Sequence, residues 1–394
     1  MIHISNKTKK LLVIIPVSIL ILCVICFAAI VVSIELRYKI EENKIAEKDS
    51  LHSESLFYYN QLTYKEQLLF EAIKIAANDF ENETEILHYR FTEKEFTRTA
   101  KAVLFDCPEL FYLDSDSLKL YCDDYKTIVK MKFLASSSDI KEMKMEMEAI
   151  SAAAVAYTNE SQTDFEKAVT IHDFLTKHCT YAGKSQTSLK IPQTAHTAYG
   201  ALIDKLAYCD GYSSAYKILL NRCGIECVIA EGKTDIEPHL WNIVKQDGKH
   251  YHVDCTWNDP DVDYLSDFSF HGYFNISDSD ISKTHLIYRE FDLPECNSTE
   301  NYYSMKQAKV VSPDEFENVA YVQLKDAVSK NRSYFEIYPI YTNSEEDYKE
   351  SLLSAIDRIN QEYEKSILSR SFKSFVTSED GYAVTIQIFY INQQ

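Results

Sequence analysis

Hydrophobic residues recur at helical spacing directly after Cys209. They fall on one face of a period of about 3.6 residues at Tyr212, Ala215, Tyr216, Leu219 and Leu220. Gly224 follows them and favours a helix end, because glycine readily adopts the left-handed conformation common there. The pattern predicts a helix with Cys209 at its N-terminus, where free N–H groups favour a thiolate over a thiol. Gly211 removes side-chain bulk, so we expect a substrate backbone to approach closely.

Strand-forming residues dominate 238–244 and 250–257, with Asp247-Gly248 between them. Asp-Gly is a strong signal for a two-residue hairpin turn. That turn places Gln246 opposite Lys249 and makes His239 and Asp254 diagonal neighbours on one face, about 7–8 Å apart at the backbone. A three-residue loop would instead put them on opposite faces.

The remaining pattern predicts a mixed fold with regions on both sides of this helix and hairpin. Capping boxes open helices at Thr63, Thr92 and Thr163. Residues 107–112 and 128–133 read as extended, and 139–157 as a long helix. Further on, Ser312-Pro313 opens a helix, 335–341 and 382–390 alternate like strands, and 345–370 is largely helical. We expect loops over the cleft at 184–193 and 261–270.

Residues 11–34 form an uncharged apolar run after a tail that contains Lys7, Lys9 and Lys10. Twenty-four residues are enough to span a bilayer with some tilt. The run is longer than the core of a typical cleaved signal peptide. We therefore expect an uncleaved single-pass anchor that leaves the bulk of the chain outside the cytoplasm.

The composition narrows the classes of partner. Acidic residues outnumber basic ones by 60 to 41, for a net charge of −19. No basic patch with interleaved aromatic residues occurs, so we expect no nucleic-acid partner. The excess acidity reads mostly as a solvated surface, and it could also favour basic substrates.

Cys209, His239 and Asp254 follow one another in the order of a thiol acyl-transfer triad. In such a triad a thiolate attacks a carbonyl, an imidazole moves the proton and a carboxylate fixes the tautomer of the imidazole. Each residue alone has a simpler interpretation: a small buried cysteine, a hydrogen-bonded histidine and a turn carboxylate. Their conjunction favours catalysis.

The stretch from about Asp164 to Ile276 resembles the transglutaminase-like superfamily, a branch of the papain-like cysteine enzymes. Three motifs carry the resemblance: Cys209-Asp210-Gly211-Tyr212, Pro238-His239-Leu240-Trp241-Asn242, and Tyr251-His252-Val253-Asp254-Cys255-Thr256-Trp257-Asn258-Asp259-Pro260. Two positions where the family often has valine depart from it, Tyr208 and Cys255, and Tyr208 could narrow the cleft.

The resemblance implies an α+β, papain-like core with a helix-borne cysteine facing an antiparallel sheet. It implies Cys209 as nucleophile, His239 as general base and acid, and Asp254 as the orienting carboxylate. The Cys209 N–H is expected to stabilise the oxyanion, with Tyr199 or Gln193 as a second donor. Tyr208 and Trp241 are expected at the substrate cleft.

The other cysteines and histidines leave two questions open. Outside residues 11–34 eight cysteines remain, and reserving Cys209 leaves an odd number, so a full disulfide framework does not balance. His250, His252 and Cys255 could ligate zinc. However, Cys255 falls on the opposite strand face, so we expect neither a metal nor an organic cofactor.

Taken together, the patterns divide the chain into a basic tail (1–10), a transmembrane anchor (11–34), a stalk (35–50), an accessory, mostly helical region (51–160), a catalytic domain (161–297) and an α+β appendage (298–394). We expect thiol-dependent acyl transfer at protein or peptide amides, with hydrolysis favoured over crosslinking. A cell-wall component is a further candidate partner. The alternatives are a catalytically inactive binding module and a structural envelope protein.

Overall fold

The computed structural model describes residues 56–123, 125–184, 191–235, 237–259, 268–342, 344–363, 367–376 and 383–391. The chain divides into two compact units, Met1–Asn60 and Gln61–Gln394. The predicted anchor at 11–34 and stalk at 35–50 lie outside the described residues, as do most of the two expected cleft loops. Within the described ranges, no helix combines the length and apolar character needed to cross a membrane.

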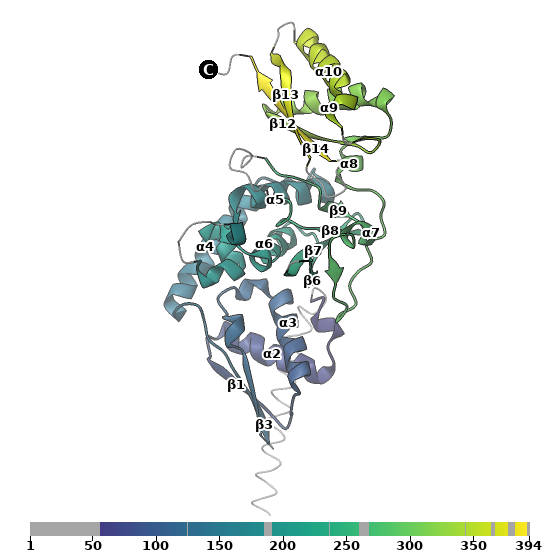
Figure 1. Ribbon diagram of the computed structural model, residues 1–394. Coiled ribbons are helices and arrows are strands. Elements are labelled where there is room, and N and C mark those ends of the chain that lie inside the picture. The colour runs from purple at the N-terminus through teal and green to yellow at the C-terminus, as the bar shows by residue number, and fades with distance from the viewer. Residues whose placement is uncertain are drawn as a thin grey trace, which may run out of the picture. The chain divides into compact units, whose positions relative to one another are not determined.

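The region before residue 160 combines helices with a small sheet (Figure 1). Its helices are α2 (Tyr64–Asn78), α3 (Glu93–Asp106) and α4 (Ser137–Val155), and its antiparallel strands lie in the order β1 (Glu83–Leu87), β3 (Lys126–Lys130) and β2 (Lys119–Cys122). The capping boxes predicted at Thr63 and Thr92 are confirmed.

The prediction of an extended segment at 107–112 is wrong. Pro108–Leu110 forms the short 3-10 helix η3. Pro108 takes the first position of this turn, where its fixed φ suits a helix and its missing N–H costs nothing. A second short turn, η4 (Ser115–Ser117), follows before β2.

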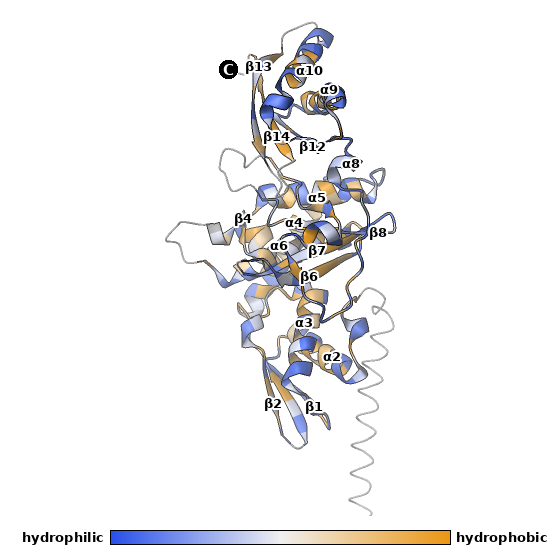
Figure 2. Cartoon of the chain, turned by 45° about the vertical axis from the view of Figure 1, so that its right-hand side comes forward, coloured by the Kyte–Doolittle hydropathy of each residue, from blue (hydrophilic) through white to orange (hydrophobic). Residues whose placement is uncertain are grey.

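The core places two helices beside one antiparallel sheet. Helices α5 (Asp164–His178) and α6 (Cys209–Arg222) pack together, and the Tyr216 hydroxyl of α6 donates to the Ala168 carbonyl of α5 over 3.0 Å. The sheet has the order β10 (Leu286–Ile287), β6 (Cys227–Lys233), β7 (Pro238–Gln246), β8 (Lys249–Val253) and β9 (Phe274–Ile276). Figure 2 shows hydrophobic residues along β6 and β7, where α6 packs.

Short elements connect these parts of the core. They are β4 (Thr180–Tyr181), which pairs in parallel with β5 (Leu206–Ala207), the 3-10 helices η5 (Ala182–Lys184) and η6 (Gln193–His196), the π-helical turn η7 (Gly200–Asp204), and the helices α7 (Asp278–Ile281) and α8 (Tyr302–Met305).

The hairpin register predicted from the Asp-Gly turn is confirmed. Gln246 pairs with Lys249, and the ladder continues to Asn242 opposite Val253. Asp247 and Gly248 have φ values of 49° and 78°, as a type I′ turn requires. Asp254 lies just past the end of β8, on the same face as His239.

The C-terminal module is a four-stranded sheet packed against two helices. Its strand order is β11 (Lys309–Val310), β12 (Tyr334–Pro339), β14 (Val384–Tyr390) and β13 (Leu368–Val376), and its helices are α9 (Pro313–Ser329) and α10 (Lys349–Glu362), with the short turn η9 (Glu345–Asp347) before α10. Phe316, Leu352 and Ile386 are fully buried between the layers. The helix predicted over 345–370 is too long, because residues from Leu368 onwards pair with β14.

Candidate active site

Cys209 is the first residue of α6, directly after the N-cap residue Tyr208. Its side chain is partly exposed. No acceptor contacts the Cys209 N–H among the residues that the structure describes, so this group is available at the positive end of the helix dipole. The other seven cysteines in the described ranges are also free thiols.

Gly211 has a different role from the one expected. A Cβ at this position would lie 2.8 Å from the Ala195 carbonyl oxygen and 2.9 Å from that of Thr197. Glycine is therefore required because the segment ahead of η7 crosses the start of α6 at close range. The close approach is made by the protein's own backbone.

His239 lies on β7 between the other two predicted site residues. Its Nε2–H donates to Asp254 Oδ2 over 2.6 Å, and the ring lines the same cavity as Cys209. The histidine is 2% exposed and Asp254 is fully buried. The structure thus brings the three residues together, with the imidazole paired to the carboxylate and close to the thiol.

Asp254 receives four hydrogen bonds, two on each oxygen. Oδ1 accepts from the backbone N–H groups of Thr256 and Trp257 at 2.9 and 3.1 Å. Oδ2 accepts from His239 and from Nε2 of His285, the latter over 3.2 Å. A buried carboxylate with this many donors has little freedom to turn.

The same contacts determine the pKa values. Burial raises the pKa of the Asp254 carboxyl, but the charges and hydrogen bonds of His239 and His285 outweigh it and hold the pKa well below its usual range. Burial lowers the pKa of His239, whereas Asp254, with a smaller contribution from Cys209, raises it to about 10. The pair favours an imidazolium beside an ionised carboxylate.

A cavity of about 630 Å³ opens in front of Cys209. Tyr208 lines it, as expected from the sequence, and stacks on His196 with ring centroids 4.6 Å apart. Tyr181 also lines it, and its hydroxyl donates to Glu237 over 3.2 Å. His196 in turn contacts Asp210 Oδ2 over 2.8 Å, and this bond raises the pKa of the imidazole.

The structure places the three other candidates of the sequence elsewhere. The Tyr199 hydroxyl donates to Glu146 over 2.5 Å and the ring stacks on Phe111, so Tyr199 does not supply an oxyanion donor. Gln193 lines an adjoining cavity of about 250 Å³. Trp241 is 1% exposed and packs behind His239, with Nε1 donating to His252. Its contribution is to the packing of the histidine.

In the part of the chain that the structure describes, three groups of His, Asp and Cys side chains lie close enough to hold a metal ion: His172, Asp173 and His271; His239, Asp254 and His285; His252, Asp278 and Cys296. The hydrogen bonds of the third group argue against metal binding there. The Trp241 indole, which can only donate, contacts His252 Nδ1 over 2.9 Å, so the proton of the neutral imidazole lies on Nε2, the atom that faces Asp278.

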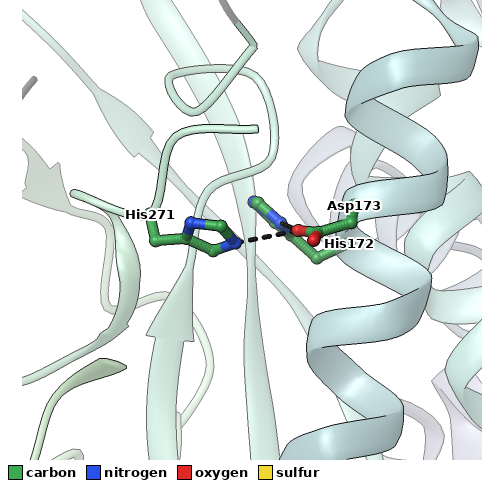
Figure 3. Close-up of side chains that lie close together, drawn as sticks. All are labelled: His172, Asp173 and His271. Carbon is green, nitrogen blue, oxygen red and sulfur yellow. Dashed lines mark hydrogen bonds and ion pairs between the residues drawn. The ribbon is translucent and has the colours of Figure 1, made fainter. Parts of the chain in front are cut away.

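A similar constraint holds in the first group, which Figure 3 shows. Asn258 Oδ1 accepts from the Tyr273 N–H, so its Nδ2 donates to His172 Nε2 and the proton of His172 faces Asp173. His271 contacts Asp173 over 2.8 Å through Nε2 and Glu336 over 2.5 Å through Nδ1. These contacts fit an imidazolium held by two carboxylates. Burial lowers the pKa of His271, but the two carboxylates outweigh burial and raise the pKa to about 9.

Comparison with known proteins agrees with this geometry. Residues 151–255 match the family model described as the transglutaminase-like superfamily. The chain carries a transglutaminase-like domain. The match includes Cys209, His239 and Asp254. No curated protein is significantly similar to the chain.

The solved structures to which the chain is similar include a TGase and two candidate proteases. One is a TGase, with 13% identity over 44% of this chain and 50% of that one and a TM-score of 0.26. Another is a candidate cysteine protease from Cytophaga hutchinsonii, with 11% identity over 44% and 64% of the two chains and a TM-score of 0.24. A candidate protease from Parabacteroides distasonis is 13% identical over 34% and 30%, with a TM-score of 0.21. The chain therefore spans between 30% and 64% of the length of these structures.

Sequence reasoning missed two residues of the transglutaminase-like site. His285 reaches Asp254 from the segment between α7 and β10, 31 positions away, without any local motif. Tyr181 lies at the end of β4, which pairs with β5 immediately before the cysteine helix. The pairing partners Leu206 and Ala207 lie far from Tyr181 along the chain, so no local motif indicates this contact.

Proposed function

We propose that this protein is a cysteine-dependent enzyme that transfers acyl groups from protein or peptide amides through a thioester on Cys209. The observation that carries the proposal is the position of His239, which is hydrogen-bonded to the buried Asp254 and lines the same cavity as Cys209. An imidazolium in this position stabilises a thiolate, which is the nucleophilic form of cysteine.

The steps follow from this arrangement. The Cys209 sulfur attacks the amide carbonyl, and the Cys209 N–H at the start of α6 stabilises the oxyanion that forms. His239 gives its Nδ1 proton to the leaving nitrogen, so the C–N bond breaks and a thioester remains. The neutral imidazole then takes a proton from the acceptor, and attack by the acceptor oxygen or nitrogen releases the Cys209 thiolate, which restores the thiolate beside the imidazolium.

We favour water as the acceptor, so that the outcome is peptide hydrolysis or glutamine deamidation. The cavity in front of Cys209 is lined in part by Thr97, Glu237 and Pro238, all of which are exposed, so water reaches the site. An amine acceptor would give crosslinking through the same thioester. The two outcomes differ only in the second half-reaction.

Mass spectrometry of peptide mixtures incubated with the soluble fragment tests the proposal. Hydrolysis gives cleaved products or deamidated glutamine, and crosslinking gives peptides joined with loss of ammonia. We expect Cys209→Ala to abolish every product. Cys223→Ala is the matched control, because Cys223 is a partly exposed free thiol at the C-cap of the same helix, α6, where its sulfur contacts the Thr158 hydroxyl. Products that persist in Cys209→Ala would contradict the proposal.

We also propose that residues 11–34 anchor the protein in a membrane with the catalytic part outside the cytoplasm. The support is the length of the uncharged run and the short basic tail ahead of it. Protease accessibility of residues 56–391 in intact and permeabilised cells tests the orientation. Cleavage only after permeabilisation would contradict it.

A further inference from the structure

Two adjoining cavities form one groove beside Cys209. The larger, of about 630 Å³, contains Cys209 and His239 in its lining, and the smaller has a volume of about 250 Å³. Both are lined by Leu104, His196 and Asp210, so they meet next to the start of α6. A groove that continues on one side of the nucleophile suits an extended peptide better than a small molecule.

One wall of this groove belongs to the region before the transglutaminase-like domain. Phe96, Ala100 and Leu104 on α3 line the larger cavity, and Leu118 extends the same wall. Phe111 and Leu113 continue it along the smaller cavity. All of these residues lie outside the 151–255 match. The region predicted to be accessory therefore supplies an apolar surface that faces the nucleophile.

The core supplies the rest of the lining of the larger cavity. Its apolar members are Tyr181, Tyr208, Pro238 and Leu240. Burial of a Leu-sized side chain against such surfaces contributes about 1.5–3 kcal/mol of transfer free energy.

Ion pairs hold α3 in place against the catalytic helix and the sheet. Lys217 on α6 is 3% exposed, donates to the Phe105 carbonyl over 2.5 Å and lies 3.5 Å from Asp106, at the end of α3. Lys101 contacts Glu231 of β6 over 2.5 Å and Glu290 over 2.7 Å. The apolar wall thus has a fixed position relative to Cys209.

The charges along the groove are mostly negative. Asp114 and Asp116 line the smaller cavity and Glu237 lines the larger. Among the described lining residues of both cavities, Lys101 is the single lysine or arginine, and two glutamates neutralise it. A cationic group on a substrate gains from this field, and an anionic group is repelled.

We propose that this groove is a peptide-binding site shared between the two regions, and that it selects peptides with a bulky apolar side chain next to the reacting amide and a basic side chain nearby. The proposal rests on the acyl-transfer function above and adds the class of substrate. Residues 93–118 then determine specificity.

Electrophilic peptides that alkylate Cys209 test the selection directly. The probes are chloroacetyl tetrapeptides that differ only in composition: Leu with Lys, Leu with Asp, and Gly with Lys. Iodoacetamide, which needs no groove, is the reference for intrinsic thiol reactivity. We expect the Leu/Lys probe to react about tenfold faster than either other probe, relative to iodoacetamide. The advantage over the Leu/Asp probe should fall at high salt.

Variants assign the selection to the groove. Leu104→Ser is expected to remove most of the preference for Leu, and Ala100→Leu, which fills the same wall without adding polarity, to reduce it as well. Asp114→Asn with Asp116→Asn is expected to remove most of the preference for Lys over Asp. Glu142→Gln with Glu350→Gln is the control: it makes the same charge change at exposed positions outside the groove.

The outcomes separate the two proposals. If iodoacetamide labels Cys209 rapidly in a His239-dependent manner but the three probes do not differ, the substrate class is wrong and the enzyme proposal stands. Preferences that survive in both Leu104→Ser and Ala100→Leu would also overturn the role of α3. If the rate at which iodoacetamide labels Cys209 does not depend on His239, the enzyme proposal on which this inference rests is itself contradicted.

Discussion

His285 places its Nε2 3.2 Å from Oδ2 of Asp254, the oxygen that also receives the proton of the candidate catalytic histidine. The Nδ1 atom of His285 contacts the Thr284 hydroxyl over 2.8 Å, and the rings of Trp241, Trp257 and Tyr273 surround the imidazole. Two histidines thus hold the Asp254 carboxylate in place. His285 is a positioning residue for the pair that Asp254 forms with His239.

Replacing His285 changes the pH behaviour of the site. In His285→Leu, Oδ2 loses one donor and attracts the His239 proton more strongly, so the pKa of His239 rises and the alkaline limb of the activity profile moves to higher pH. His285 also interacts electrostatically with His252, so the replacement changes the surroundings of that imidazole as well.

The measurement is the pH profile of peptide hydrolysis, or of Cys209 alkylation if no substrate is known. His285→Gln keeps an N–H donor near the position of Nε2 and is expected to restore most of the wild-type profile. A uniform loss of rate in both variants, with no shift of the limb, would mean that His285 only stabilises the fold.

Lys217 and Asp106 form a buried ion pair that couples α6 to α3, with side chains 4% and 0% exposed. Lys217→Met removes the cation beside the buried Asp106 carboxylate, which costs about 3–5 kcal/mol of unfolding free energy. Adding Asp106→Leu is expected to recover most of that loss, since the buried negative charge is then gone. Urea unfolding of the two variants measures this. Equal stabilities of the single and double variants would contradict the coupling.

The His271 site predicts a pH dependence of stability. Burial lowers the pKa of this imidazole, but Glu336 and Asp173 outweigh it and raise the pKa to about 9, above the value near 6.5 of an unfolded chain. Its contribution is therefore fully present below about pH 6.5 and is lost as the pH rises through 9.

Urea unfolding at pH 7 and pH 9.5 measures this dependence against His271→Gln, which cannot be protonated. We expect the wild-type protein to lose more stability than the variant between these two pH values. The variant itself should be less stable at pH 7, by about 3–5 kcal/mol if both carboxylates stay charged. Parallel pH profiles of the two proteins would rule out an imidazolium at this position.

Local patterns in the sequence predicted much of the core. The Asp247-Gly248 turn fixes the register of the hairpin, and parity alone then puts His239 and Asp254 on one face. Thr163 and its capping box mark the start of α5, and Gly224, with φ of 77°, marks the end of the cysteine helix. These features depend on residues close together in the chain, which is why pattern reasoning reaches them.

Contacts between distant segments could not be predicted in this way. His285 reaches Asp254 because of the path that the chain takes after β9. Helix α3 is held beside the groove by Lys217 of α6, which donates to the Phe105 carbonyl 112 positions earlier in the chain. The prediction of Tyr199 as an oxyanion donor did not take account of Glu146. This residue lies on α4, outside the local motif, and accepts the hydrogen bond of the Tyr199 hydroxyl. Such pairings depend on tertiary packing, which overrides local propensity.

The rate of Cys209 alkylation as a function of pH, read by peptide mass spectrometry on a soluble fragment and compared with His239→Ala, tests the central claim most directly. A thiolate stabilised by the His239 imidazolium predicts fast labelling below pH 7 that collapses in the variant, while Cys223 in the same sample labels slowly in both proteins. Labelling of Cys209 that rises only near pH 8.5, the value of a free thiol, and is unchanged in His239→Ala would contradict the enzyme proposal.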